Sequence, residues 1–317
     1  MASTALAVLT FAVLIRTFPP ITCAIANHGF RGTLTRLHKH SSNYSAAVHR
    51  DTRRLAFLTP APTTSPAIAA LQAMAENGVG AYHVSLSIGT PPLTFPAILD
   101  TGSDLLGVGR FSYCLRSDAG ASPILFGSLA NVTKGDGAQS TPLVRNPKVP
   151  VSRAPYYYVN LTGVRVGAAD LPVTPATFGF TSTGAGGVIV DSGTTFSYLA
   201  KAGYAMLERA FLSQTAGLLT RVSGAPFDFD LCFEAASDVD AVLVPGLVLS
   251  FAGGAEYSVP RRSYFDAVDE EGRVACLLVL PTGGVSVIGN VMQMDLHLLY
   301  DLDGGTMSFA PADCATV

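Results

Sequence analysis

Short apolar runs separated by turn residues fill the chain beyond residue 80. Apolar and polar positions alternate over residues 82–88, as in a half-buried strand, and residues 95–99 predict a more buried one. Further strands are expected over residues 156–161, 164–166, 188–190, 285–288, 292–300 and 306–310. Residues 200–219 instead have helical spacing, with Tyr204, Leu207, Ala210 and Phe211 on one face. The pattern predicts an all-β body of two lobes with one substantial helix.

Two of the predicted strands end in nearly the same turn. One ends in Asp100, Thr101, Gly102 and Ser103, and the other ends in Asp191, Ser192, Gly193 and Thr194. Either turn alone is an ordinary turn sequence. Two copies, each after an apolar strand, predict that each lobe supplies one carboxylate to a shared site.

Asp100 and Asp191 are therefore the candidate catalytic residues. The glycines allow a tight turn beside each carboxylate, and the hydroxyl residues of both turns can hydrogen-bond the carboxylates. Two carboxylates a few Å apart share a proton at mildly acidic pH. The ionised one can act as general base on water while the protonated one polarises a substrate carbonyl. The pair predicts hydrolysis of an amide bond.

Composition and charge narrow the class of protein. Of 317 residues, 49% are apolar and 14% are charged, which predicts a folded chain with room for two domains. Residues 27–54 contain six Lys and Arg but one acid, whereas residues from 55 onward contain 13 basic and 22 acidic residues. Because the body would repel phosphates, nucleic acid is excluded as a partner. A basic segment that lies on an acidic surface and detaches as carboxylates protonate fits better.

The N-terminus predicts a secretory signal peptide over residues 1–26. Residues 5–15 are apolar or small apart from Thr10, and residues 24–26 offer a small-x-small cleavage site. The run is too short to span a bilayer, so no stable membrane span is expected after its removal. A buried helix or an uncleaved anchor is the alternative.

Cysteine usage also suits export. Removal of the signal peptide leaves Cys114, Cys232, Cys276 and Cys314, which predicts two disulfides with three possible connectivities. No Cys or Cys/His cluster indicates a metal site. Asn43, Asn131 and Asn160 begin sequons, so a glycoprotein is expected.

Several motifs together resemble a known family. The two Asp turns, residues 82–92, residues 111–115 and the Val287-Ile288-Gly289-Asn290 element resemble the plant-type, nepenthesin-like branch of the pepsin-like aspartic proteases. The resemblance covers roughly residue 82 to the C-terminus. It implies a bilobal β fold and an aspartic endopeptidase, optimal at acidic pH, that needs no metal or cofactor. It also implies the disulfides Cys114–Cys314 and Cys232–Cys276.

The resemblance also implies an organisation along the chain. A signal peptide (1–26) would precede a basic prosegment and linker (27–75), an N-terminal lobe (76–150) and a C-terminal lobe (151–317). We expect a monomeric zymogen, secreted or vacuolar, whose mature form acts on an extended, largely apolar peptide or protein substrate.

The first lobe departs from the family pattern. Asp191 and Gly289 are 98 residues apart in the second lobe, but only 14 positions separate Asp100 from Cys114 in the first. No hairpin flap, no Cys-rich insert and no Trp after the first Asp turn are recognisable. The join near Leu105, Leu106 and Gly107 predicts an internal deletion of roughly 80 to 90 residues, by the symmetry of paired lobes.

The missing segment leaves three hypotheses open. The first is an aspartic endopeptidase that uses Asp100 and Asp191. The second is a non-catalytic binding protein of the xylanase-inhibitor type, which loss of the flap favours. The third is an incomplete gene model or splice product with no stable fold. The intact sequence of both Asp turns favours the first over the second.

Overall fold

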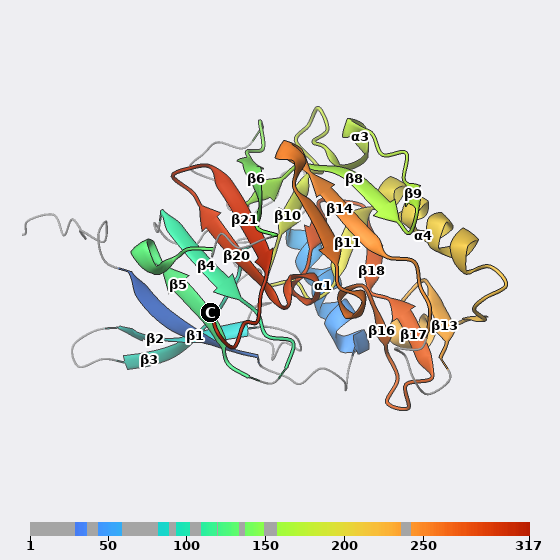
Figure 1. The fold of residues 1–317 in the computed structure, drawn as a ribbon, viewed down its shortest axis with the longest axis horizontal. Coiled ribbons are helices and arrows are strands. Elements are labelled where there is room, and N and C mark those ends of the chain that lie inside the picture. The colour runs from blue at the N-terminus through green and yellow to red at the C-terminus, as the bar shows by residue number, and fades with distance from the viewer. Residues whose placement is uncertain are drawn as a thin grey trace, which may run out of the picture.

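The fold is built mainly of β-strands (Figure 1). A computed structural model describes residues 29–36, 44–58, 82–88, 93–101, 109–118, 120–132, 137–148, 157–235 and 242–317. The predicted deletion join near residues 105–107 lies outside the described residues. No helix in the described ranges is long and apolar enough to cross a membrane.

The largest sheet has 13 strands. In sheet order they are β18 (Val279–Thr282), β11 (Ser197–Ala200), β19 (Ser286–Ile288), β10 (Val188–Val190), β7 (Tyr158–Val159), β6 (Gln139–Val144), β21 (Thr306–Pro311), β20 (Leu296–Asp301), β4 (Arg110–Cys114), β5 (Ser122–Phe126), β1 (Phe30–Arg36), β2 (Tyr82–Ile88) and β3 (Leu93–Ile98). β20 pairs with β4, and β21 pairs with β6. The last strands of the chain therefore tie the early strands to the later ones.

Two four-stranded sheets complete the strand framework. One has the order β12 (Arg221–Val222), β13 (Cys232–Glu234), β17 (Val274–Leu277) and β16 (Phe265–Ala267), and the other has the order β15 (Glu256–Val259), β14 (Leu247–Phe251), β8 (Leu161–Val166) and β9 (Ala169–Asp170). The α-helices are α1 (Tyr44–Leu58), α3 (Pro175–Phe178) and α4 (Lys201–Thr215). Short 3₁₀ helices are η2 (Gly127–Leu129), η4 (Ala225–Phe227), η6 (Ala252–Gly254), η7 (Arg261–Ser263) and η8 (Asn290–Gln293).

Most strands lie where the apolar pattern predicts them. β2 and β10 have the predicted bounds, and α4 matches the predicted helix, with Tyr204, Leu207 and Phe211 buried. The expected strand over residues 292–300 is partly wrong, because its first residues form η8 and the strand begins only at Leu296. The predicted all-β class is confirmed.

The prediction of a single substantial helix is wrong, because α1 is also 15 residues long. Its buried face includes Ala47, Val48, Leu55 and Leu58. The same face carries Asp51, which is fully buried. A charged residue inside the apolar stripe obscures the helical period in the sequence. In Figure 1, α1 lies near the centre of the molecule, between the early strands and the later ones.

The basic N-terminal segment also contributes a strand. β1 pairs with β5 on one side and β2 on the other, so it is an internal strand of the largest sheet. Leu34 on β1 is fully buried. The sequence pattern gave this region mixed helical character, but the β-branched Thr33 and Thr35 and pairing on both sides favour the extended form.

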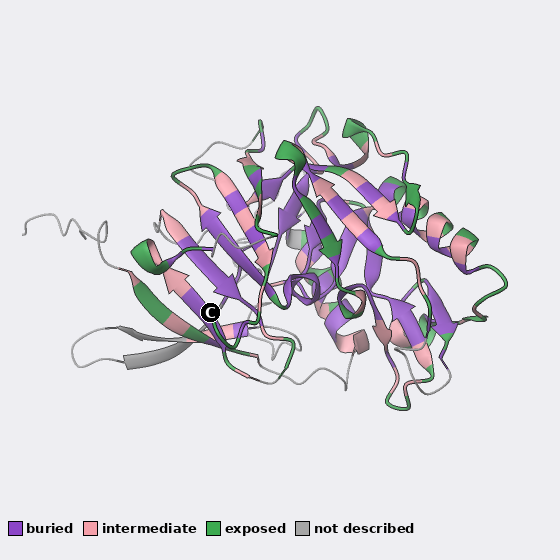
Figure 2. Ribbon diagram, viewed as in Figure 1, coloured by how far each residue is buried: buried purple, intermediate pink, exposed green. Residues whose placement is uncertain are grey.

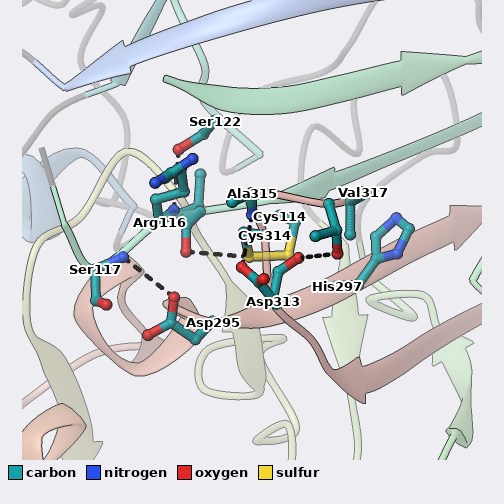
Figure 3. Close-up of a disulfide and its surroundings, with 12 residues drawn as sticks. Cys114, Arg116, Ser117, Ser122, Asp295, His297, Asp313, Cys314, Ala315 and Val317 are labelled. Carbon is teal, nitrogen blue, oxygen red and sulfur yellow. Dashed lines mark hydrogen bonds between the residues drawn. A yellow bond between two sulfur atoms is a disulfide. The ribbon is translucent and has the colours of Figure 1, made fainter. Parts of the chain in front are cut away.

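The core runs under all three sheets, as the buried inner faces of Figure 2 show. Phe111 on β4 stacks on Tyr300 on β20 with ring centroids 4.7 Å apart. A disulfide between Cys114 and Cys314 joins the end of β4 to the C-terminal tail, beside a hydrogen bond from Ser117 to Asp295 (Figure 3). A second disulfide joins Cys232 on β13 to Cys276 on β17.

Candidate active site

The two predicted aspartates lie at the ends of two strands. Asp100 follows β3, and Asp191 follows β10. β10 runs between β19 and β7, and all three of its residues are buried. Asp191 is 0% exposed and Asp100 is 5% exposed, so both carboxylates lie in the interior of the described structure. Strand ends in a sheet are rigid, which fixes each carboxylate in place.

The two Asp turns are joined by a reciprocal set of hydrogen bonds. The Thr101 hydroxyl donates to the Val190 carbonyl at 2.9 Å and accepts from the Ser192 backbone N–H at 2.9 Å. In return, the Ser192 hydroxyl donates to the Leu99 carbonyl at 3.0 Å and accepts from the Thr101 N–H at 3.1 Å. Each hydroxyl residue thus binds the backbone of the opposite turn. This network sets the distance between the turns, which is a role that the predicted site residues Thr101 and Ser192 share.

The other two residues of the second turn hold Asp191 itself. Gly193 donates its backbone N–H to Oδ1 at 2.8 Å, and the Thr194 hydroxyl donates to Oδ2 at 2.6 Å. A Cβ on Gly193 would lie 2.9 Å from Oδ1 of Asp100. Glycine is needed there because the opposite carboxylate approaches the backbone closely. Gly102 and Ser103, the matching residues of the first turn, lie outside the described residues.

Arg54 of α1 binds both carboxylates. Its Nε donates to Oδ2 of Asp191 at 2.8 Å, and its Nη2 donates to Oδ1 of Asp191 at 3.1 Å. The same Nη2 also donates to Oδ1 of Asp100. The guanidinium therefore occupies the space between the two aspartates. A cation in that position neutralises the charge of two buried carboxylates.

The pKa values of the three groups follow from this arrangement. Burial raises the pKa of Asp191, but the Arg54 guanidinium and the hydrogen bonds from Thr194 and Gly193 more than offset it, so the pKa lies below its usual range. Burial and then the Asp191 charge hold the pKa of Asp100 above its usual range, against the opposing effect of Arg54. Burial lowers the pKa of Arg54, but the two carboxylates raise it further, so the guanidinium stays charged.

Three further contacts hold α1 on the body. Arg50 donates to the Thr195 hydroxyl, and Ser45 donates to the carboxylate of Asp228. Asp51 accepts hydrogen bonds from the backbone N–H groups of Thr195 and Phe196 at 2.9 to 3.0 Å. Because Thr195 directly follows the second Asp turn, α1 covers the site as well as plugging it.

Sequence reasoning identified the aspartates but not Arg54 or Asp51. The available signal was the basic cluster of residues 27–54 with its single acid, which predicted a segment that lies on the body. It gave no means to choose Arg54 from six basic residues. In the described ranges, no group of three or more His, Cys, Asp or Glu side chains is arranged to hold a metal ion.

Comparisons with known proteins bear on the fold and the site. Aspartic proteinase nepenthesin-1 of Nepenthes gracilis is 34% identical over 241 residues, which cover 75% of this chain and 51% of that protein. Aspartyl protease family protein 2 of Arabidopsis thaliana is 36% identical over 235 residues, which cover 73% of this chain and 45% of that protein. A family model described as "Xylanase inhibitor C-terminal" matches residues 156–311.

Two solved structures share the fold. The crystal structure of edgp aligns with a TM-score of 0.55 at 21% identity and covers 65% of this chain and 55% of that one. Basic 7S globulin from soybean aligns with a TM-score of 0.50 at 17% identity, covering 65% and 51%. The pepsin-like β fold that the resemblance implies is thereby confirmed.

The chain spans about half the length of the curated relatives it matches. The matched part includes most of this sequence, and the relatives are named as aspartic proteases. Over that part, the chain is related to the nepenthesin-like branch of the pepsin-like aspartic proteases.

Proposed function

We propose that this chain is the latent form of an aspartic endopeptidase that hydrolyses peptide bonds at acidic pH. Asp100 and Asp191 are its catalytic pair, and Thr101, Ser192, Gly193 and Thr194 position them. The observation that carries the proposal is the pair of buried carboxylates, held by turns that bond to each other and neutralised by one guanidinium.

The environments of the two carboxyls support a division of roles. The pKa of Asp191 is lowered and that of Asp100 is raised, so Asp191 is the better candidate for the ionised general base. Asp100, which takes up a proton more readily, is then the acid that polarises the substrate carbonyl. The water would lie between them, in the space that the Arg54 guanidinium occupies in the latent form.

Latency follows from the same contact. While Arg54 is bound, neither carboxylate can hold the water, and α1 blocks approach to the second Asp turn. Protonation of the carboxylates removes the charge that attracts the guanidinium. We therefore assign residues 27–75 as a prosegment and linker that are displaced at acidic pH, after removal of a signal peptide at residues 1–26. The lobes are assigned to residues 76–150 and 151–317.

Proteolysis by the full chain tests this function. The chain is incubated with a denatured protein at pH 3 to 4, with and without a statine-type inhibitor, beside an Asp191→Ala variant. The proposal expects cleavage that both the inhibitor and the substitution abolish. Cleavage that survives Asp191→Ala would show that another group is responsible.

A second function remains as a candidate because the family model that matches residues 156–311 is named for xylanase inhibitors. In that case the chain binds another protein without cutting it. Capture of a purified xylanase by the full chain, unchanged by Asp100→Ala, together with no proteolysis at any pH, would favour this candidate over the first.

The two disulfides support a route through the secretory pathway, to the cell exterior or the vacuole, because disulfides persist in oxidising compartments. We propose a monomer with glycans at exposed sequon asparagines such as Asn131 and Asn160. Expression in plant cells followed by glycosidase digestion, microscopy of a fluorescent fusion and sizing of the purified chain tests these points.

A further inference from the structure

Asp51 of α1 occupies a site on the body that is separate from the catalytic pair. Its side chain is fully buried, although no part of the dyad contacts it. The body supplies the backbone N–H groups of Thr195 and Phe196 and the hydroxyl of Tyr198. We propose that this is a binding site for a carboxylate group of a peptide ligand, filled by Asp51 while α1 is in place.

The site is lined by hydrogen-bond donors. Oδ1 of Asp51 accepts from Thr195 N at 3.0 Å and from Nη2 of Arg50 at 3.2 Å. Oδ2 accepts from Thr195 N at 3.0 Å, from Phe196 N at 2.9 Å and from the Tyr198 hydroxyl at 3.5 Å. Burial and the Asp51 charge raise the pKa of Tyr198 well above its usual value, so its hydroxyl stays protonated and able to donate.

Donors at both oxygens select a carboxylate over an amide. An asparagine at this position would point its NH₂ group at donors whichever way it was turned, and one buried donor would lose its acceptor. Loss of one buried partner corresponds to a preference of about tenfold or more for the carboxylate. Burial acts in the other direction and raises the pKa of Asp51, so the donors and Arg50 are needed to keep an anion there.

Three of the four partners belong to the body and remain when α1 leaves. Thr195 is four residues beyond Asp191, and Asp51 is about one helical turn from Arg54, so the site lies next to the catalytic pair. An anchored peptide would thus present its chain to the aspartates. As a subsite of the proposed peptidase this inference rests on the proposed function, but the binding site itself needs no catalysis.

The first test is rescue of a vacated site by a small carboxylate. Asp51→Ala removes the carboxylate and leaves room for formate. Thermal unfolding of the full chain is measured in sodium formate and in sodium chloride at equal ionic strength. The proposal expects formate to raise the Tm of Asp51→Ala by roughly 2 °C or more beyond chloride. The wild type and Asp170→Ala, a substitution of an exposed aspartate, should respond alike to both salts.

A second variant covers the case in which Asp51→Ala does not fold. Asp51→Asn keeps the volume of the side chain and changes only its charge and one acceptor. The proposal expects a Tm roughly 2 °C or more below that of the wild type at pH 6. An equal or higher Tm for Asp51→Asn, or no advantage of formate over chloride, would overturn a carboxylate site.

The final test identifies the source of the carboxylate. Hydrogen exchange of residues 44–58 in the full chain is followed with three short peptides, which carry a blocked Asp, a blocked Asn or a free C-terminus. Faster exchange with the Asp peptide than with the Asn peptide assigns an acidic side chain. Faster exchange with the free C-terminus assigns a terminal carboxylate. If neither exceeds the Asn peptide, the site serves only Asp51 and the proposal is wrong. A chain that cleaves nothing can still pass this test.

Discussion

Nε of Arg54 lies 2.8 Å from Oδ2 of Asp191, although the two residues are 137 positions apart in the chain. The contact joins the N-terminal basic segment to the second Asp turn. It is a buried, charge-assisted hydrogen bond, and the Arg54 side chain is only 19% exposed. Such contacts are strong when complete and costly when one partner is lost. The stability of the chain should therefore depend on Arg54 in a way that depends on pH.

Arg54→Ala should lower the free energy of unfolding by about 3 kcal/mol at pH 6. Because the pKa of Asp191 is lowered in the folded chain, the stabilisation is complete above the ordinary carboxyl pKa of 3.8 and is lost as pH falls through the lowered value. The raised pKa of Asp100 acts in the opposite direction, so the difference between the variant and the wild type is the useful quantity. Urea unfolding from pH 2 to 7 measures it.

Arg53→Ala is the matched control, because Arg53 is the exposed neighbour on the same helix. Its effect should be small across the same range of pH. A difference between wild type and Arg54→Ala that stays constant down to pH 2 would contradict the ion-pair account.

Thr101→Val should destabilise the link between the two Asp turns. Valine keeps the shape of the side chain but leaves the Val190 carbonyl and the Ser192 N–H without their partner. We expect a loss of about 2 to 3 kcal/mol in the free energy of unfolding. Thr162→Val removes an exposed hydroxyl that donates to the Ser250 carbonyl, and it should cost less than about 0.5 kcal/mol. Equal losses in urea unfolding for both variants would count against the network.

Gly193→Ala should displace Arg54 or Asp100. The added Cβ would lie 2.9 Å from Oδ1 of Asp100 and 3.0 Å from Cζ of Arg54, which is too close for both to stay in place. We expect a lower Tm and faster hydrogen exchange in residues 44–58. Gly246→Ala is the control, because a Cβ there meets no atom within 4 Å. Unchanged exchange in Gly193→Ala would show that the site is looser than described.

Removal of the Cys114–Cys314 disulfide should cost more stability than removal of Cys232–Cys276. The first closes a loop of 200 residues and the second a loop of 44. Loop-closure entropy in the unfolded chain predicts a difference of about 1 kcal/mol between the two serine double variants. Unfolding in urea under non-reducing conditions compares them, and a larger loss for Cys232–Cys276 would contradict this reasoning.

Sequence patterns predicted the strands best where apolar runs are short and end in turn residues. β10 is three buried aliphatic residues between glycines and Asp191, and its bounds and its role in placing Asp191 followed from that. The pairing of Thr101 with Ser192 could not be predicted, because it depends on two turns 91 residues apart meeting in space. Asp51 hid α1, because its charge stands in the apolar stripe and its acceptors are satisfied by donors far along the chain.

The central claim is that Arg54 keeps an otherwise competent pair of aspartates latent. The most direct measurement is the initial rate of cleavage of a denatured protein at pH 5 by the full chain, by Arg54→Ala and by Arg53→Ala. At this pH the carboxylates still hold Arg54 in the wild type. The account predicts that Arg54→Ala cleaves at least about tenfold faster than the other two, and that adding Asp191→Ala to it abolishes the activity. If the folded Arg54→Ala chain cleaves no faster than the wild type at any acidic pH, the claim is wrong.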